Sequence, residues 1–251
     1  MITFSTMQIL ICLGLGMGLG ICGGLLGIGG GLIAIPVITY LFHMPQSLAQ
    51  GTVLIMIIPN VLLSFIQYKK RNNIQLRNII VLCAISSIVS FFAARYASHM
   101  NSDNLTSLFS GFLLIIGGYY FTQVSFKAKL PKFNLSPAFL PLLGVVSGIA
   151  SGLFTVGGGL VVVPLLVALF SYSQTKAQGT ALALVVPGAV SALVSYSLSG
   201  DVSWHIGIPL ALGGVFSVSW GVYLAHKIPS NILKICFCSV IFFVAIFTWL
   251  I

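Results

Sequence analysis

The stretch that decides the fold is GLLGIGGG at residues 24–31, because it returns as GLFTVGGG at residues 152–159, 128 positions later. The same offset places the AQGT of residues 49–52 on the AQGT of residues 177–180. Matches of Gly and Gln in one fixed register, with no gap, indicate that a single unit has been duplicated. We therefore predict a chain made of two homologous repeats.

The composition shows whether this duplicated chain folds in water or in a membrane. Of its 251 residues, 58% are hydrophobic and only 5% are charged, whereas a soluble domain is about one quarter charged. Residues 1–68, 133–175 and 235–251 contain no Lys, Arg, Asp or Glu. One membrane crossing takes about 20 apolar residues, so these runs are long enough for several crossings. The sequence predicts an all-α polytopic membrane protein.

Each repeat divides into the same apolar segments. A Gly-rich segment comes first, breaks at the triple glycine and continues as a short apolar piece, and three further segments follow, which makes about four membrane-embedded segments per repeat. The first repeat is assigned to residues 1–126, a basic connecting loop to 127–137 and the second repeat to 138–251. The expected helices cover about 7–28, 32–42, 48–67, 78–97 and 105–124, then 138–156, 160–170, 176–197, 204–225 and 232–250.

The number of crossings in each repeat decides how the repeats are oriented. If the first segment crosses the membrane, each repeat has four crossings and the repeats are parallel; if it turns back at the glycines, three net crossings make them inverted. Cytoplasmic loops are enriched in Lys and Arg. The parallel arrangement divides the basic residues seven to four, whereas the inverted one divides them ten to one, with Arg95 alone opposite. The charges favour inverted repeats with both termini outside, and Asp103 and Asp201 then lie outside too.

The triple glycines are predicted to interrupt a helix inside the membrane. Each Gly costs about 1 kcal/mol of helix stability relative to Ala, and non-helical backbone at this depth persists only inside protein or beside a wet cavity. Paired broken helices in two halves are typical of transporter sites near the midplane. The helix after each break would aim its N-terminus at that site, which suits an anion. The predicted substrate-binding glycines are Gly29, Gly30, Gly31, Gly157, Gly158 and Gly159.

Close helix packing is the alternative explanation for glycine in a membrane protein. Three adjacent glycines do not share one helix face, so we favour a binding role for the triple glycines. Gly16, Gly20 and Gly24 recur every four residues, as do their counterparts 128 positions later, and are expected to pack against other helices. Four amide and hydroxyl side chains have two open interpretations, contacts to an anion or hydrogen bonds between helices. They are Gln50, Thr52, Gln178 and Thr180.

The two glycine breaks and the paired AQGT segments resemble the TauE/SafE family, whose members are also called sulfite exporters or DUF81 permeases. The resemblance extends over essentially the whole chain. It implies a permease of the cell inner membrane for sulfur-containing anions such as sulfite or organosulfonates. One departure lies at the second break, where Phe154-Thr155-Val156 replaces Leu26-Gly27-Ile28. Thr155 either adds a hydroxyl to the pocket or packs.

The predicted function is therefore transport of a small anion across the inner (plasma) membrane by alternating access around a midplane site. An anion channel, or a uniporter with a non-sulfur substrate, is the alternative. An enzyme is not expected, because the chain has two acidic residues and scattered histidines instead of a group of catalytic side chains. We expect no cofactor and no metal.

The expected partners are the small anion and the lipid bilayer, and a homo-oligomer remains open. Nucleic acid is not expected, although the formal net charge is +9. The basic residues are few and flank apolar runs, as membrane-flanking charges do.

Overall fold

The computed structural model describes residues 6–27, 29–71, 79–125, 139–156, 158–172, 174–228 and 230–250. Within these ranges the chain forms ten α-helices and no strand, which confirms the all-α prediction, and six helices are long and apolar enough to cross a membrane. The predicted connecting loop 127–137 lies outside the described residues. The helices are α1 (Thr6–Leu26), α2 (Gly31–Phe42), α3 (Gln46–Arg71), α4 (Ile80–Ser98), α5 (Ser102–Ser125), α6 (Leu140–Phe154), α7 (Gly159–Phe170), α8 (Gln174–Leu198), α9 (Trp204–Lys227) and α10 (Ser230–Leu250).

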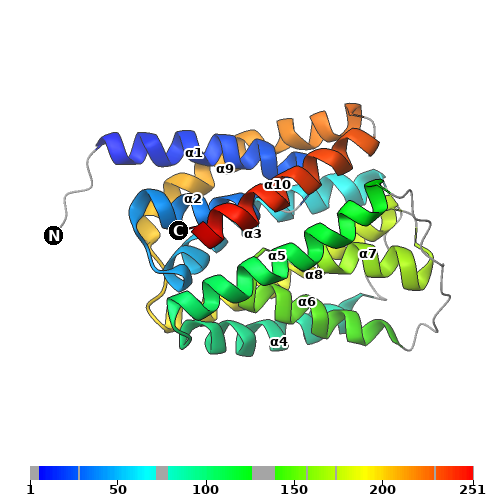
Figure 1. Ribbon diagram of the computed structural model, residues 1–251, viewed down its shortest axis with the longest axis horizontal. Coiled ribbons are helices and arrows are strands. Elements are labelled where there is room, and N and C mark those ends of the chain that lie inside the picture. Colours follow the sequence, from blue (N-terminus) through cyan, green and yellow to red (C-terminus); the bar gives the residue numbers. More distant parts are fainter. Residues whose placement is uncertain are drawn as a thin grey trace.

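The helices lie side by side along one long axis, and their ends fall into two groups (Figure 1). One end of the bundle holds the start of α1, the end of α2, the α4–α5 and α8–α9 connections and the end of α10. The other end holds the start of α6 and the ends of α3, α5, α7 and α9. The pair α1–α2 therefore leaves and returns to one end, and the pair α6–α7 leaves and returns to the other.

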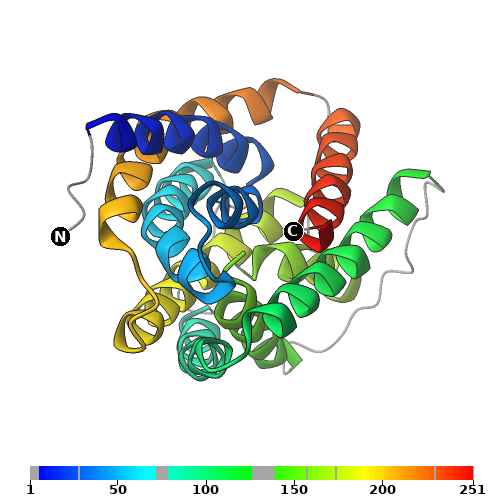
Figure 2. The same ribbon diagram turned by 60° about the vertical axis from the view of Figure 1, so that its left-hand side comes forward.

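Glycines on α1 bring this helix into close contact with α9, and both views show the two helices side by side (Figures 1 and 2). A Cβ atom added at Gly16 would collide with the carbonyl of Leu210, and one at Gly24 with the carbonyl of Val218. The approach is reciprocal, because a Cβ at Gly213 of α9 would collide with the carbonyl of Leu13. The packing role expected for these α1 glycines therefore agrees with the structure.

The corresponding glycines of α6 face α4 in the same way. An added Cβ would lie 2.9 Å from the Leu82 carbonyl oxygen at Gly144 and 2.8 Å from the Ser86 carbonyl oxygen at Gly148. Each Gly-rich helix thus packs on a helix of the other half of the chain.

Helices α3 and α8 form the centre of the bundle. They are the most buried of the six spanning helices, and they pack against each other. Both begin with polar residues, α3 at Gln46 and α8 at Gln174, and both contain an internal proline, Pro59 and Pro187. The first break lies against α3, where a Cβ at Gly29 would meet Val61, and Gly159 after the second break lies near Ala181 and Val185 of α8.

Candidate functional site

The first break joins α1 to α2 through glycines in the left-handed conformation. Gly27, Gly29 and Gly30 have φ angles of 70°, 72° and 89°, a region that costs an L-residue about 1–2 kcal/mol. A Cβ at Gly30 would also lie 2.7 Å from the Leu19 carbonyl oxygen. Gly30 is therefore required both by its backbone conformation and by the closeness of α1.

The second break joins α6 to α7 with a different backbone. Thr155 ends α6 in the left-handed conformation, with φ 57°, and its N–H donates to the Ser151 carbonyl oxygen at 3.1 Å. The Gly158 N–H donates to Ser151 Oγ at 2.9 Å. Gly158 itself is right-handed, with φ −56°, and glycine is required there because a Cβ would collide with Ser147. Gly157 lies outside the described residues.

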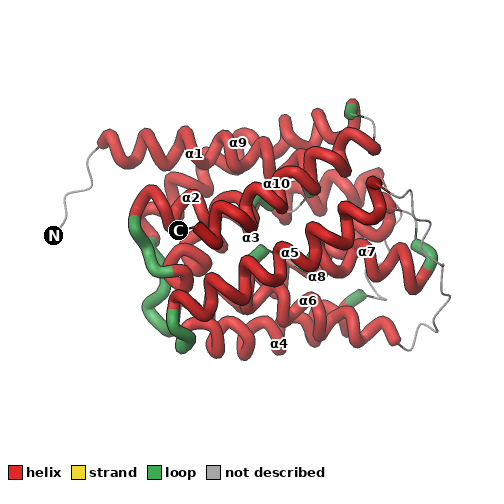
Figure 3. Tube along the Cα trace, viewed as in Figure 1, coloured by secondary structure: helices red, strands yellow, loops and turns green. Residues whose placement is uncertain are grey.

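The two breaks meet inside the bundle. A Cβ at Gly31, the first residue of α2, would lie 3.3 Å from the carbonyl oxygen of Thr155. From this region α2 runs to one end of the bundle and α7 to the other, and both breaks are inside the helical body (Figure 3). Since the first N–H groups of a helix have no intrahelical acceptor, the structure places two such helix starts, at Gly31 and Gly159, in the same interior region.

A small cavity lies between the breaks. Gly27 of the first break and Val156 and Gly159 of the second line it, together with Gln178 and apolar side chains of α3, α7 and α8. Its volume is about 10 Å³, which is about the room that one water molecule needs. Gln178 thus reaches the region predicted from the sequence, and the cavity that it lines is too small for an oxyanion.

Gln50 and Thr155 lie around a buried tyrosine that the sequence analysis did not select. The Tyr196 hydroxyl of α8 lies 2.7 Å from Gln50 Oε1 and 3.1 Å from the Gly152 carbonyl oxygen, so its one proton can serve either acceptor. The Thr155 hydroxyl lies beside it but makes no hydrogen bond of good geometry. Gln50 Nε2 is also without a partner, although Gln50 is fully buried. Two donors beside the second break are therefore available to a bound acceptor.

Thr52 is placed differently, at the junction between α3 and the α8–α9 connection. Its hydroxyl donates to the Leu48 carbonyl oxygen at 2.7 Å and accepts from the Ser203 N–H at 2.9 Å. In the same junction Ser47 Oγ donates to Asp201 Oδ1 at 3.2 Å. Partial burial raises the pKa of Asp201, an effect that the Ser47 hydrogen bond and the charge of His99 partly offset. In this conformation Thr52 serves the junction, and its predicted contact to an anion remains a prediction.

Thr180 is buried, but it does not line the small cavity, whose α8 wall is formed by Gln178, Ala181, Leu182 and Val185. The structure therefore places Gln178 at the small cavity between the breaks. Gln50 and Thr155 lie at Tyr196, 18 residues further along α8, and Thr52 and Thr180 belong to neither group.

A signal for Tyr196 was present in the sequence. The offset of 128 residues that aligns the glycines also places Tyr68 on Tyr196 and Gln46 on Gln174. A buried polar side chain repeated in both halves of a membrane protein is a candidate for a shared structural or binding role.

Comparison with known proteins identifies the family of the chain. Residues 12–248 match the family model described as sulfite exporter TauE/SafE. A "probable membrane transporter protein" of Methanocaldococcus jannaschii is 29% identical over 239 residues, which cover 88% of each chain. YdhB of Bacillus subtilis, with the same description, is 26% identical over 220 residues, 86% of this chain and 90% of the relative.

No solved structure matches the chain. The family match includes both glycine breaks and at least part of all ten helices. The two relatives are described as membrane transporters, and the matched residues cover most of their lengths. The chain is a membrane protein and belongs to the TauE/SafE family of sulfite exporters.

Proposed function

We propose that this protein transports small anions, of the sulfite or organosulfonate type, across the inner (plasma) membrane by alternating access around the two breaks. The observation that carries the proposal is the closeness of the two breaks, where a Cβ at Gly31 would lie 3.3 Å from the Thr155 carbonyl oxygen. It gathers two helix starts in the interior, where partial positive charge and free N–H groups favour an anion without a basic side chain.

The small size of the cavity between the breaks fits a transporter better than an open pore. A cavity of about 10 Å³ between the breaks means that an anion enters only after the surrounding helices separate. When they do, Gln50 Nε2 and the Thr155 hydroxyl supply donors that lack a partner in the closed conformation. The energetic cost of leaving buried donors unpaired, about 1–3 kcal/mol each, then favours an acceptor at this place.

The proposal includes inverted repeats. The pairs α1–α2 and α6–α7 return to opposite ends of the bundle (Figure 1), as two hairpins of opposite orientation would. Broken helices of this kind in inverted halves surround midplane sites in several transporter folds. The end that holds the α4–α5 and α8–α9 connections carries Asp103 and Asp201, and we assign it to the outside.

The test is flux of an anion panel into proteoliposomes: sulfite, thiosulfate, sulfonates, sulfate and a carboxylate. Gly30→Val and Gly158→Val should abolish flux, because one forces a left-handed valine and the other collides with Ser147. Gly14→Val is the matched control, since a Cβ at Gly14 meets no atom within 4 Å. Saturable flux supports transport, and unsaturable flux would instead indicate a channel.

A milder substitution separates binding from folding. Thr155→Val keeps the branched shape but removes a buried hydroxyl without a partner, so stability should be unchanged or higher. If the hydroxyl contacts the anion, the half-saturating concentration rises roughly tenfold, since a hydrogen bond to a charged group contributes about 1.5–3 kcal/mol. Unchanged flux kinetics in this variant would remove Thr155 from the proposed site.

A further inference from the structure

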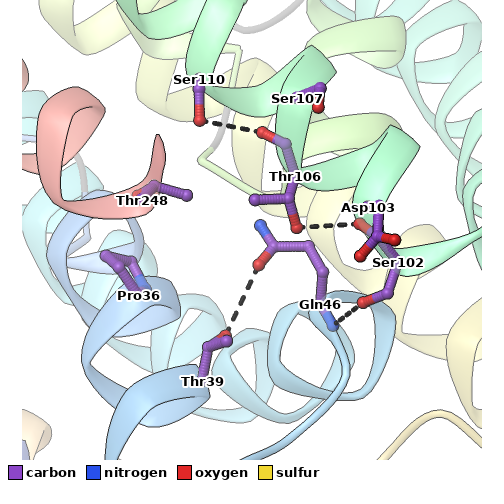
Figure 4. A pocket seen from close by; sticks show the side chains of 9 residues that line it. All are labelled: Pro36, Thr39, Gln46, Ser102, Asp103, Thr106, Ser107, Ser110 and Thr248. Carbon is purple, nitrogen blue, oxygen red and sulfur yellow. Dashed lines mark hydrogen bonds between the residues drawn. The ribbon is translucent and has the colours of Figure 1, made fainter. Parts of the chain in front are cut away.

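A second and larger cavity lies at the end of the bundle that holds the α2–α3 and α4–α5 connections. Its volume is about 290 Å³, and its walls come from α2, the start of α3, the first turns of α5 and the end of α10 (Figure 4). Asp103 is exposed at its mouth, whereas Gln46, Ser110 and Thr248 are buried deeper. This cavity, which we name the outer pocket, is distinct from the small cavity between the breaks.

The hydroxyl groups of the outer pocket present lone pairs to its interior. Thr106 Oγ1 donates to the Ser102 carbonyl oxygen at 2.8 Å, Ser110 Oγ to the Thr106 carbonyl oxygen at 2.9 Å, and Thr248 Oγ1 to the Val244 carbonyl oxygen at 2.7 Å. A hydroxyl has a single proton and two acceptor sites. Because each proton is given to the helix backbone, these three side chains offer mainly acceptors to a ligand.

The amide and the carboxylate of the outer pocket complete its chemistry. Gln46 is 1% exposed, its Oε1 accepts from Thr39 Oγ1 at 3.5 Å, and its Nε2 has no partner and points into the pocket (Figure 4). Asp103 is the one formally charged side chain among the described residues that line the pocket. The pocket therefore combines a negative charge, several acceptors and one unpaired donor.

We propose that the outer pocket binds a small, singly charged cationic group. The carboxylate and the hydroxyl oxygens match either an inorganic ion such as Na⁺, bound through hard oxygen ligands, or the ammonium group of a small organic solute. Gln46 Nε2 donates to an acceptor that accompanies the cation, either water or the solute's own oxygen. A free anion is disfavoured, because it would face Asp103 with no basic side chain in the described lining to balance it.

The pocket is connected to the breaks by the helices that line it. α5 contributes Ser110 to the pocket and, half a turn further, Phe112, whose ring stacks on Phe154 at 4.4 Å between centroids. Phe154 is the last residue of α6 before the second break. A ligand that changes the position of α5 therefore acts on a helix that packs next to the second break.

The carboxylate belongs to one half of the chain only. The offset of 128 residues places Asn231 on Asp103 and Lys234 on Thr106, whereas Gln46 is matched by Gln174. The Gln46 amide thus has a counterpart in the second repeat, whereas the Asp103 carboxylate and the Thr106 hydroxyl, which favour a cation, have none.

The test is thermal unfolding of the purified full-length chain in detergent, at constant ionic strength. NaCl is compared with choline chloride, and β-alanine, which has an ammonium group, with glycine betaine. The quaternary ammonium groups of choline and betaine have no N–H donor for the oxygen atoms of the pocket and are too bulky to coordinate them as Na⁺ does. We expect NaCl or β-alanine to raise the midpoint of the wild-type protein by about 2–4 °C at saturating ligand. Asp103→Asn and Thr248→Val should each lose this shift.

Asp201→Asn is the matched control, because Asp201 is the chain's other acidic residue and bonds Ser47 instead of lining the pocket. It should keep the shift, and the midpoints in choline report whether each variant is folded. A shift with NaCl identifies an inorganic ion, and one with β-alanine alone identifies an ammonium group. No shift with either, or a shift that persists in Asp103→Asn and Thr248→Val, would overturn the proposal. The measurement needs no flux, so its result is independent of the proposed transport.

Discussion

At the scale of single residues, a hydrogen bond between the two halves of the chain lies beside the second break. Gln50 comes from the first half and Tyr196 from the second, and their side chains meet at 2.7 Å beside the second break. The sequence singled out Gln50, which is repeated as Gln178, and left open whether it contacts an anion or another helix. It could not predict Tyr196 as its partner, because the pairing depends on how α3 and α8 cross.

Tyr196→Phe tests this contact. The change removes one hydroxyl and leaves Gln50 Oε1 and the Gly152 carbonyl oxygen without that donor. Leaving buried acceptors unpaired should destabilise the protein by about 1–3 kcal/mol, measured as the unfolding midpoint in detergent. Tyr96→Phe is the control, since Tyr96 is 66% exposed. Equal midpoints for the two variants would show that the Tyr196 hydroxyl is not a structural donor.

At the scale of the elements, the sequence predicted where the helices lie along the chain, but it did not predict which helices pack against each other. The long apolar runs and the glycine breaks predicted ten helical segments, and most observed bounds lie close to the expected ones. α3 is longer than expected, from Gln46 to Arg71, because Gln, Lys and Arg favour helix and can continue it beyond the apolar core.

The two breaks show the limit of sequence reasoning most clearly. Their glycines align, yet the first uses left-handed Gly29 and Gly30, whereas the second uses left-handed Thr155 and a right-handed Gly158. Backbone angles at a break are set by the side chains packed around it, here Ser147 and Ser151. Similarly, spacing of four residues identified a packing face on α1 but not α9 as its partner.

Gly20→Ile tests the α1–α9 interface. A Cβ at Gly20 would lie 2.8 Å from the Gly214 Cα and would collide with Ser217 Oγ, so isoleucine must push the helices apart. Overpacking of this kind costs about 1–3 kcal/mol or more. Gly18→Ile, where a Cβ meets no atom within 4 Å, should leave the unfolding midpoint nearly unchanged. An equal loss in both variants would mean that helix propensity, and not the interface, explains the effect.

At the scale of the whole molecule, charge and architecture agree. Lys69 and Lys227 lie near the ends of α3 and α9 and Lys176 near the start of α8, all at one end of the bundle. Arg95, in the last turn of α4, lies at the other end with Asp103 and Asp201. This is the distribution that the positive-inside rule favoured for inverted repeats.

The start of α1 and the end of α10 lie at the same end (Figure 1), and the basic residues lie mostly at the other. Reporter fusions at both termini should therefore give the same side, and this side should be the outside. An alkaline phosphatase fusion at the C-terminus should be active and a green fluorescent protein fusion dark. A fluorescent C-terminal fusion would contradict the proposed orientation, and opposite results at the two termini would contradict the fold.

The packing of α1 against α9 has a consequence for the synthesis and membrane insertion of the protein. α1 is made first, but the surface that receives its glycine face ends at Lys227. At a synthesis rate of about 5–20 residues per second, the roughly 200 residues in between take on the order of 10–40 s. During that interval the nascent α1 lies in the lipid or beside the insertion machinery, and its glycine face has no helix packed against it. Ribosome stalling before α9 should therefore leave a chain that membrane proteases recognise and remove.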